Sequence, residues 1–426
     1  MPIHKELDRI LKRGVAEIII EDEFRRLLES GKPLRLKEGF DPSRPDIHLG
    51  HVVGLRKLRQ LQDLGHKVIL IVGDWTAQIG DPSGQSQTRP MLTAGEVQAN
   101  AETYMKQFFK VVDRERTEVR WQSEWFGKFD LADVIRLTSK FTVAQIMARE
   151  DFSSRQAAGR PIALTELLYP LLQAYDSVMV EADVEFGGID QKFNFLMGRE
   201  LQQIVGQRPQ QIFMMPLLVG TDGRMKMSKS LGNCITVEDP PNEMFGRLMS
   251  VADHLIMDYF ELITDVPDEE LVGFRQQLAS GSVNPMTLKK RLAREIVCQF
   301  HGRQAAGEAA HRFEKEVQMK EQPDQIPEHV ISFERLSEAA TVSGLIYELK
   351  LAVSRSEAKR LISQGAIEVD GRRISSDMRI VPGDDLANGG GDGEELIFRH
   401  GGVIRVGKRR WARIFLKEEL SNVRLA

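Results

Sequence analysis

The first half of the chain alternates between the two spacings of hydrophobic positions that distinguish strands from helices. Residues 34–40 set Leu34 and Leu36 against polar neighbours, which is typical of a strand. Residues 49–64 space their apolar side chains as on a helix and stop at a glycine, and residues 67–73 are short, β-branched and apolar like a buried parallel strand. This order is a βαβ unit, so it predicts a doubly wound α/β domain with a parallel sheet. In such a sheet, ligands bind beyond the carboxyl ends of the strands.

The pattern becomes helical in the next part of the chain. Four segments have helix-forming sequences and lack strand-like runs, namely residues 243–251, 253–264, 268–278 and 286–318. A polar stretch with prolines at residues 321–328 is typical of a linker. We therefore expect an α/β domain over residues 1–235, an α-helical domain over 236–320 and a linker over 321–340.

The C-terminal part, residues 341–426, predicts a small α+β domain. Its expected elements are a helix at 355–363, a strand at 366–369, a hairpin turn at Asp370-Gly371, a flexible glycine-rich loop at 388–393 and a strand at 403–414.

Composition agrees with about three domains and narrows the class of protein. The chain has 426 residues, of which 42% are hydrophobic and 28% charged, as in an ordinary soluble globular protein. This composition excludes a disordered chain, a collagen-like fibre and a disulfide scaffold. The 58 Lys and Arg against 62 Asp and Glu give a net charge of −4, so no overall basic excess points to nucleic acid. The charge is uneven, however, because residues 341–426 hold 15 basic and 12 acidic side chains, a local +3.

Localisation can also be predicted from the sequence. Apolar stretches such as residues 68–72 are far shorter than the roughly 20 residues of a membrane span. The first ten residues lack the apolar core of a signal peptide. Cys234 and Cys298 are too few for a metal cluster between them and are expected to be reduced thiols. We expect a cytoplasmic protein.

A pair of histidines follows the first predicted strand. His48 and His51 frame Leu49-Gly50 where that strand passes into the first predicted helix. On the opening turn of the helix the two imidazoles and the helix N-terminus would face one point, which suits negative charge on a phosphate. Gly50 would let a flat ligand approach the backbone. The alternative is that the histidines are ordinary surface or capping residues.

A second motif, Lys226-Met227-Ser228-Lys229-Ser230, follows a glycine-bearing turn near the end of the predicted α/β domain. Two lysines on a mobile loop could close over a pyrophosphate leaving group, although a solvated charged loop would have the same composition. The ordered pair of HxGH and KMSKS resembles the signatures of class I aminoacyl-tRNA synthetases. That resemblance implies a Rossmann-type catalytic domain.

Further motifs narrow the resemblance to the bacterial tyrosyl-tRNA synthetases. Gly39-Phe40-Asp41-Pro42 is similar to the family's GFDP, and residues 79–84 are similar to its IGDPSG. Residues 169–176 resemble its tyrosine-binding helix, and residues 187–191 its GGxDQ turn. The ordered similarity covers roughly residues 34–235.

The predicted tyrosine-binding helix has its own chemical pattern. Tyr169, Gln173 and Asp176 are spaced so that one helical face carries all three polar groups, with leucines and a valine elsewhere. The stripe either faces solvent or lines a pocket. In the pocket, Asp176 would accept a hydrogen bond from a phenolic hydroxyl, and phenylalanine would leave that carboxylate unpaired at a cost.

The resemblance implies a role for each matching residue. Catalysis would depend on His48, His51, Lys226, Lys229 and Arg89. ATP would be bound by Asp41, His48, Gly50, His51, Gly188, Asp190, Lys226, Ser228 and Lys229. Tyrosine would be bound by Gly39, Asp81, Tyr169, Gln173, Asp176 and Gln191. For Asp41, the alternative is an Asx turn before the proline, which does not exclude a ligand role.

The chain departs from many family members at two positions. Lys37 stands where many carry a tyrosine, which leaves open a second donor to the substrate hydroxyl. Gln85 stands where the second mobile loop carries a lysine, which would shift phosphate stabilisation onto Arg89, Lys226 and Lys229.

The C-terminal unit resembles the S4-type RNA-binding module. Residues 354–362, followed by 365–371, match its pattern, whereas the glycine-rich stretch 387–395 is an insertion relative to that family. The alternative is an amphipathic surface helix. The RNA-binding residues implied by the resemblance are Arg355, Lys359, Arg360, Arg372, Arg373, Lys408, Arg409 and Arg410.

The resemblance implies an enzyme that joins L-tyrosine to tRNA in two steps, through tyrosyl-adenylate. ATP would bring Mg²⁺ with it, no protein metal site is expected, and the helical domain would bind the anticodon. The family further implies a homodimer, with residues 120–165 near the interface. Two alternatives are a tryptophanyl-tRNA synthetase, against which Asp176 argues, and an RNA-binding protein with an inactive nucleotide domain, against which the intact motifs argue.

Overall fold

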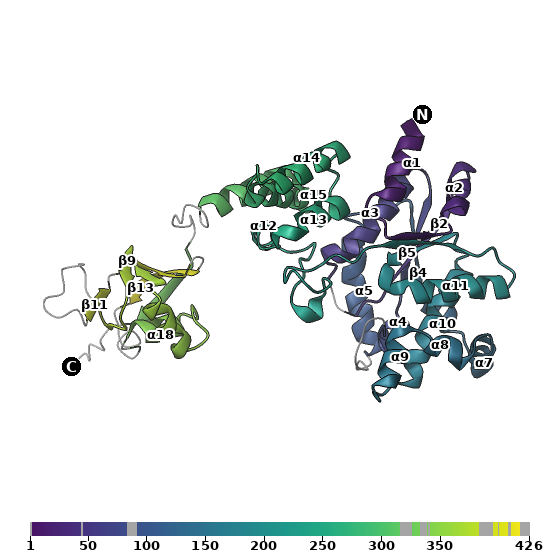
Figure 1. The fold of residues 1–426 in the computed structure, drawn as a ribbon. Coiled ribbons are helices and arrows are strands. Elements are labelled where there is room, and N and C mark those ends of the chain that lie inside the picture. The colour runs from purple at the N-terminus through teal and green to yellow at the C-terminus, as the bar shows by residue number, and fades with distance from the viewer. Residues whose placement is uncertain are drawn as a thin grey trace. The chain divides into compact units, whose positions relative to one another are not determined.

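The chain forms two compact units in the computed structural model, Met1–Gly307 and Glu308–Ala426 (Figure 1). The structure describes residues 2–43, 46–82, 92–315, 326–332, 339, 341–382, 395–398, 400–407 and 410–417. We describe each unit by itself. The finer division at residues 235, 320 and 340 stays a prediction.

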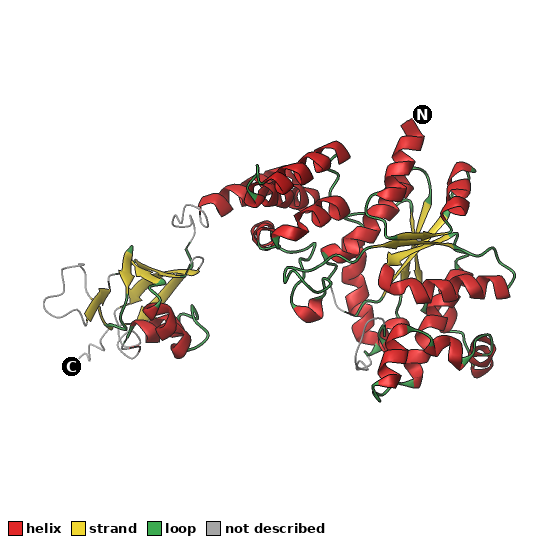
Figure 2. Ribbon diagram, in the orientation of Figure 1, coloured by secondary structure: helices red, strands yellow, loops and turns green. Residues whose placement is uncertain are grey.

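A six-stranded sheet with helices on both faces organises the first unit (Figure 2). Its strands are β1 (Glu17–Ile19), β2 (Arg35–Phe40), β3 (Lys67–Val72), β4 (Thr117–Trp121), β5 (Val184–Gly188) and β6 (Gln211–Met215). They lie in the order β1-β6-β5-β2-β3-β4, and all neighbouring pairs are parallel except β1 with β6. The predicted doubly wound α/β fold is confirmed.

The predicted βαβ unit is present but is not the start of the fold. It comprises β2, α3 (Leu49–Asp63) and β3. Before it come α1 (Pro2–Lys12), the three-residue strand β1 and α2 (Glu21–Glu29). The predicted first strand and first helix are therefore the second strand and third helix, because β1 is too short to produce a recognisable alternation.

The strand order reverses between β2 and β5. From β2 the chain adds β3 and β4 on one side, then crosses through α10 (Leu164–Met179) to place β5 on the other. Helices on either side of β2 diverge at such a switch point, so the carboxyl ends of β2 and β5 border a crevice. The remaining elements of this part are α4 (Thr76–Ile79), α5 (Ala94–Phe108), α6 (Ser123–Phe126), α7 (Leu131–Thr138), α8 (Val143–Met147), α9 (Glu150–Ala157), η1 (Ile189–Gln191), α11 (Lys192–Ile204) and η2 (Lys229–Leu231).

The predicted helical segment after residue 240 is helical in the structure. It contains α12 (Pro241–Met249), η3 (Asp253–Leu255), α13 (Ile256–Ile263), α14 (Asp268–Ser280) and α15 (Pro285–Phe313). The last of these bends at Gly302, whose φ of 86° and ψ of 166° are not helical. Residues 316–318 of the predicted fourth helix lie outside the described part.

The second unit is a small α+β fold around one apolar core. Its elements are β7 (Glu328–Ser332), α17 (Val342–Glu348), α18 (Arg355–Ser363), β8 (Ile367–Val369), β9 (Arg372–Ile374), β10 (Arg379–Pro382), β11 (Glu395–Phe398), β12 (Gly402–Val406) and β13 (Arg410–Lys417). Five strands pair in the order β7-β13-β12-β8-β9. Buried side chains including Leu345, Ile362, Val369 and Ile404 fill the space between sheet and helices.

Predictions for this unit are mostly confirmed, with one error. The helix at 355–363 and the hairpin turn at Asp370-Gly371 are present, and both turn residues have positive φ, 47° and 78°. Residues 403–414, however, are not one strand. They belong to the antiparallel pair β12 and β13, which is interrupted at Gly407 with φ 65°. Alternating residues look the same on both arms of a hairpin, so the pattern alone did not reveal the turn. The predicted loop at 388–393 lies outside the described residues.

Candidate active site

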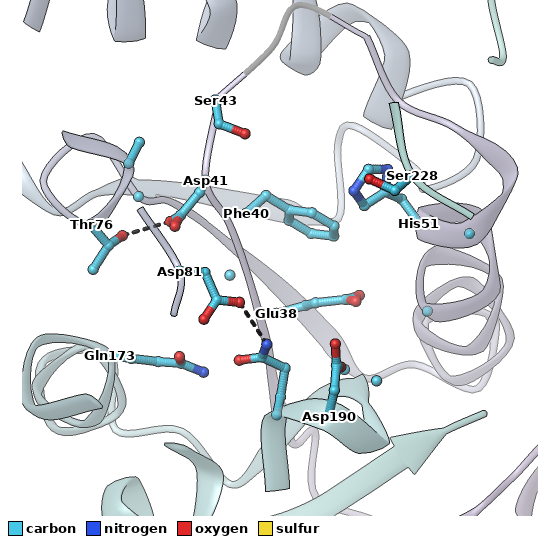
Figure 3. A pocket seen from close by; sticks show the side chains of 18 of the residues that line it. Glu38, Phe40, Asp41, Ser43, His51, Thr76, Asp81, Gln173, Asp190 and Ser228 are labelled. Atoms are coloured by element: carbon cyan, nitrogen blue, oxygen red, sulfur yellow. Dashed lines mark hydrogen bonds between the residues drawn. The ribbon is translucent and has the colours of Figure 1, made fainter. Parts of the chain in front are cut away.

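A cavity of about 680 Å³ opens at the carboxyl ends of β2 and β5, at the predicted switch point (Figure 3). Its lining includes the two histidines, the two lysines of KMSKS and the polar face of α10. Motifs that lie far apart in the sequence therefore line a single cavity.

His48 and His51 cap α3 and also line the cavity. His48 is the N-cap residue, and its Nδ1 accepts a hydrogen bond of 3.2 Å from the Gly50 N–H. His51 Nδ1 accepts from the His48 N–H, also at 3.2 Å. Since both Nδ1 atoms are acceptors, the proton of each neutral ring is on Nε2. Capping and ligand binding are thus compatible, because capping leaves each Nε2–H as a donor.

The two imidazoles are neutral near pH 7. Their rings stack with centroids 3.9 Å apart. Burial lowers the pKa of His48 well below its usual value, and His51 and the lysines of KMSKS lower it further. Burial, followed by Lys229, lowers the pKa of His51 to about 4. The pair can therefore offer neutral N–H donors to a ligand rather than positive charges.

The KMSKS segment packs directly beside the histidines. The Leu49 N–H donates to the carbonyl of Ile235 over 2.9 Å, and His48 forms a β-bridge with Thr236. The Val237 N–H also donates to the carbonyl of Ile47 over 3.0 Å. The segment that follows KMSKS, rather than the motif itself, therefore contacts the backbone at the start of α3.

Both lysines of KMSKS are engaged with acidic or aromatic groups. Lys226 Nζ donates to Asp190 Oδ2 over 2.8 Å. Lys229 Nζ lies 3.5 Å from Asp46 Oδ2 and 5.8 Å from the centroid of the Tyr104 ring. The Lys229 side chain is only 13% exposed, so a fully solvated loop does not describe this segment.

Asp41 is held by side chains on two elements. The Tyr169 hydroxyl donates to Asp41 Oδ2 over 2.7 Å. Thr76 Oγ1 donates to Oδ1 over 2.6 Å (Figure 3). The carboxylate therefore joins the end of β2 to α4 and α10. The sequence pointed to Asp41 and Tyr169 but not to their direct contact, nor to Thr76.

Asp176 lines the cavity from α10. Its side chain is buried and accepts from Gln122 Nε2 at 2.7 Å and from Trp125 Nε1 at 3.1 Å. Burial raises its pKa to about 7, while Lys37 opposes this rise. Together with buried Tyr169 and the partly buried Gln173, it lines the cavity, so the polar stripe of α10 does not face solvent. Gln122 and Trp125 were not found from the sequence.

A second polar network holds Asp81. Its Oδ2 accepts from Gln191 Nε2 over 2.8 Å. Gln191 Oε1 in turn accepts from Asn194, whose own oxygen accepts from Arg149. Arg149 also lies 3.7 Å from Asp81, which closes the loop. Asp81 and Gln191 were predicted. Asn194 lies in α11 and Arg149 just before α9, and neither belongs to a recognisable motif.

Lys37 is fully buried and uses all three of its protons. Its Nζ donates to Glu185 Oε1 at 2.9 Å, to Ser177 Oγ at 2.7 Å and to the carbonyl of Gln173 at 3.0 Å. Lys37 therefore has no proton left for a substrate hydroxyl. The donors nearest to Asp176 are Gln122 and Trp125 instead.

Glycines line parts of the cavity wall, and at two of them a side chain would clash with neighbouring atoms. A Cβ on Gly188 would lie 2.7 Å from Asp190 Oδ1 and from a Leu217 methyl carbon. On Gly50 it would lie 2.9 Å from the His48 ring. Gly39, at the end of β2, also lines the cavity.

Most of the predicted RNA-binding residues lie on the surface of the second unit. Arg355, Lys359 and Arg360 are exposed on α18, and Arg372 and Arg373 are exposed on β9. Arg410 is partly buried and donates to the carbonyl of Leu351, so its guanidinium also serves the fold. Arg89, Lys408 and Arg409, and Gln85 of the second mobile loop, lie outside the described residues.

The described part of the chain shows neither a metal-ligand cluster nor a membrane-spanning helix. No group of three or more His, Cys, Asp or Glu side chains there is arranged to hold a metal ion. In the same residues, no helix combines the length and apolar character needed to cross a membrane. Both cysteines are unpaired thiols.

Comparison with known families agrees with this geometry. Residues 29–318 match the family described as tRNA synthetases class I (W and Y), and residues 345–386 match the S4 domain. The chain belongs to the class I tRNA synthetases, with an S4 domain after the catalytic part.

Within that class its relatives are bacterial tyrosine–tRNA ligases. The chain is 58% identical to the enzyme of Dehalococcoides mccartyi (strain CBDB1) over 408 residues, which cover 96% of this chain and 98% of the relative. It is 50% identical to the Moorella thermoacetica enzyme, covering 95% of each, and 48% identical to that of Thermotoga maritima, covering 96% and 97%.

Solved structures of tyrosyl-tRNA synthetases are similar in fold to this chain. The tyrosyl-tRNA synthetase of Archaeoglobus fulgidus, solved with L-tyrosine, superposes with a TM-score of 0.60 at 26% identity, over 72% of this chain and 99% of that one. A mitochondrial tyrosyl-tRNA synthetase from Aspergillus nidulans gives 0.60 at 20% identity, over 72% and 93%.

Proposed function

We propose that this protein attaches L-tyrosine to tRNA(Tyr) in two steps, with tyrosyl-adenylate as the intermediate. The observation that carries the proposal is one cavity with two chemically different ends. At one end a buried carboxyl group, Asp176, faces a space suited to a phenol. At the other end His48, His51, Lys226 and Lys229 offer donors and positive charge suited to phosphates.

Asp176 would accept the hydrogen bond of the tyrosine hydroxyl. The hydroxyl would join Gln122 and Trp125 as a third donor to the carboxylate. Phenylalanine would occupy the same space without a donor, so the buried carboxylate would lose part of its hydrogen bonding, which is costly.

The amino group of tyrosine would bind to Asp81, the Tyr169 oxygen and Gln173. Asp81 is held in place by Gln191, and Tyr169 by Asp41. The polar groups on α10 and at the end of η1 would thus orient the substrate carboxylate towards the α-phosphate of ATP. Gly39 and Gly188 would leave room for backbone approach on either side.

The first step needs positioning and charge stabilisation rather than a base. A carboxylate oxygen of tyrosine attacks the α-phosphorus of ATP, and the bond to the pyrophosphate oxygen breaks. The carboxylate is already ionised, so no proton has to be removed. The Nε2–H groups of His48 and His51 would stabilise the negative charge of the transition state, and Lys226, Lys229 and Arg89 that of the departing pyrophosphate.

The nucleotide would be held by the residues around the histidines. Asp190 and Asp41, which line the cavity, would accept from its hydroxyl or amino groups, with Gly50, Gly188 and Ser228 also in the lining. Mg²⁺ would enter with ATP, because phosphate oxygens and water can supply most of its ligands.

In the second step a hydroxyl of the tRNA 3′ end takes the tyrosyl group and releases AMP. The exposed cations of α18 and β9 would contact tRNA phosphates, together with Lys408, Arg409 and Arg410. The helices from residue 236 to 320 would bind the anticodon part. The cytoplasm is the expected compartment, which cell fractionation would test.

We also propose a homodimer formed around residues 120–165. Large apolar side chains are exposed there, with Leu131 75%, Ile135 58% and Val143 68% accessible, and Leu164 reaches 81%. Contiguous exposed apolar groups are typical of protein interfaces. Sedimentation equilibrium of the full chain should give twice the monomer mass; a monomer at micromolar concentration would contradict the proposal.

Exchange between ATP and radioactive pyrophosphate tests the proposed function. The purified chain should catalyse exchange only when tyrosine is present, since only adenylate formation is reversible in this way. Exchange that requires tryptophan would instead show that the chain is a tryptophanyl-tRNA synthetase. If no amino acid supports exchange, the chain is not an active synthetase.

A further inference from the structure

Asn233, which follows the KMSKS motif, carries a buried amide whose hydrogen bonds all go to one neighbouring segment. The residue is 3% exposed. Its amide oxygen accepts from the Ser228 N–H over 2.8 Å. Its amide nitrogen donates to Asp222 Oδ2 over 2.9 Å and also lies 3.2 Å from the carbonyl of Lys226 and 3.4 Å from that of Met225. Only this orientation of the amide places a donor opposite each of these oxygens and an acceptor opposite the N–H.

The bonds of Asn233 fix the segment that carries the two KMSKS lysines. Ser228 and Asn233 stand at the two ends of the turn that contains Lys229, so the bond between them closes this turn at its base. The bond to the Lys226 carbonyl fixes the backbone from which the other lysine extends. Asn233 itself does not line the cavity. It can therefore determine where both lysines point without touching a ligand.

The hairpin that precedes the motif is attached to the rest of the first unit. Val219 and Lys226 form a β-bridge. The buried Tyr259 hydroxyl donates to the Val219 carbonyl over 2.6 Å, which joins the hairpin to α13. A Cβ on Gly220 would lie 2.3 Å from the amide carbon of Asn233, so glycine at this position leaves the space that the amide occupies. The amide is thus held between a fixed hairpin and the KMSKS segment.

We propose that Asn233 is a positioning residue for adenylate formation, which holds Lys226 and Lys229 where they stabilise the departing pyrophosphate. The inference rests on the proposed function, because it takes pyrophosphate as the group that the lysines meet. A cation stabilises developing charge best when it is already in place, and a misplacement of about 1 Å can cost about a hundredfold in rate. The groups proposed to bind tyrosine lie on other segments, so tyrosine affinity should not depend on Asn233.

Replacement of Asn233 by alanine should slow catalysis without weakening tyrosine binding. In Asn233→Ala the kcat of tyrosine-dependent pyrophosphate exchange should fall about a hundredfold, because the lysines lose their fixed position. The dissociation constant of tyrosine, measured by equilibrium dialysis, should stay within about twofold of wild type. An unchanged kcat would overturn the proposal. Activity and tyrosine affinity that fall together would also overturn it, because that result indicates a general loss of structure.

Asn233→Asp tests the amide with little change of shape. Its oxygen can still accept from Ser228, but a carboxylate replaces the donor beside Asp222, so kcat should also fall. Adding Asp222→Asn places a donor opposite the new carboxylate and keeps an oxygen for the N–H groups of Arg224 and Met225. The double variant should recover about tenfold in kcat, the effect of one charge-assisted hydrogen bond. No loss in Asn233→Asp, or no recovery in the double variant, would overturn the proposal.

Asn284→Ala is a matched control. Asn284 is exposed, its side-chain oxygen accepts from the Met286 N–H over 2.9 Å at the start of α15, and it does not line the cavity. Loss of this bond should leave kcat and tyrosine affinity at the wild-type level. An equal fall of kcat in this variant would overturn the proposal, because the effect would then not be specific to the KMSKS segment. Absence of tyrosine-dependent exchange in the wild type would instead overturn the proposed function.

Discussion

At the residue scale, burial moves the titrating groups of the cavity towards their neutral forms. The pKa of His51 falls to about 4, and that of Asp176 rises to about 7. Desolvation is the largest cause in both cases, since it disfavours whichever form is charged. Near neutral pH the histidines are therefore constant donors, whereas Asp176 changes its charge.

The charge on Asp176 predicts how tyrosine binding depends on pH. Above pH 7 the carboxylate is ionised and accepts from the phenol; below pH 7 it is protonated and accepts less well. The dissociation constant of tyrosine should therefore decrease about tenfold as pH rises from 6 to 8. Equilibrium dialysis measures it directly. Asp176→Asn should bind tyrosine weakly with no such trend, and an identical trend in that variant would assign the titration to another group.

At the element scale, the Lys37–Glu185 pair joins β2, β5 and α10 at the switch point. The two side chains are 0% and 1% exposed, and Lys37 also holds the backbone of α10 at Gln173. The pair fixes the helix turn that carries the polar stripe. Alternation in residues 34–40 predicted the strand correctly, but not that its charged residues are buried, because both faces of this parallel sheet are covered.

Removing one member of this pair should destabilise the protein strongly. Lys37→Met leaves Glu185 buried without its cation, and the free energy of unfolding should fall by about 3–5 kcal/mol. The double variant Lys37→Met/Glu185→Met removes both charges and should recover much of that loss. Urea unfolding followed by circular dichroism compares them. If the double variant is no more stable than the single one, the loss comes from packing rather than from the unpaired charge.

At the scale of the whole molecule, the net charge of −4 is an average over unlike parts. Residues 341–426 carry +3, which leaves −7 for the first 340 residues. Five of the predicted RNA-binding cations are exposed on α18 and β9 of the second unit. The cavity that we propose to be catalytic is lined by residues of the first unit, so RNA affinity and adenylate formation should respond to different substitutions.

Neutralising the cations of α18 tests this division. The double variant Arg355→Ala/Lys359→Ala should bind tRNA more weakly, and the slope of log affinity against log salt concentration should shrink by about 1–2, because each cation that contacts a phosphate releases about one counterion. Filter binding over a range of salt concentrations measures the slope. Tyrosine-dependent pyrophosphate exchange should stay at wild-type level. Lys32→Ala, an exposed lysine of the first unit, should change neither quantity; an unchanged slope in the double variant would remove α18 from the RNA-binding surface.

The sequence alone determined the local features of this protein. Hydrophobic spacing located β2, α3, β3 and α18, because a helix or strand needs only neighbouring residues to show its period. The HxGH and KMSKS motifs and the polar stripe of α10 were visible for the same reason. The error at residues 403–414 and the missed strand β1 occurred where a turn or a very short element left no local signal.

Only the tertiary structure decided which groups meet and how they are charged. Lys37 and Glu185 are 148 positions apart, and Arg149 reaches Asp81 from the bend between α8 and α9, which has no recognisable motif. Glu38 looks like an ordinary polar strand residue until Gly54 and the cavity are placed around it. Burial, hydrogen-bond partners and pKa depend on contacts between distant segments. These properties of the site therefore follow from the packed sheet and helices rather than from any single stretch of sequence.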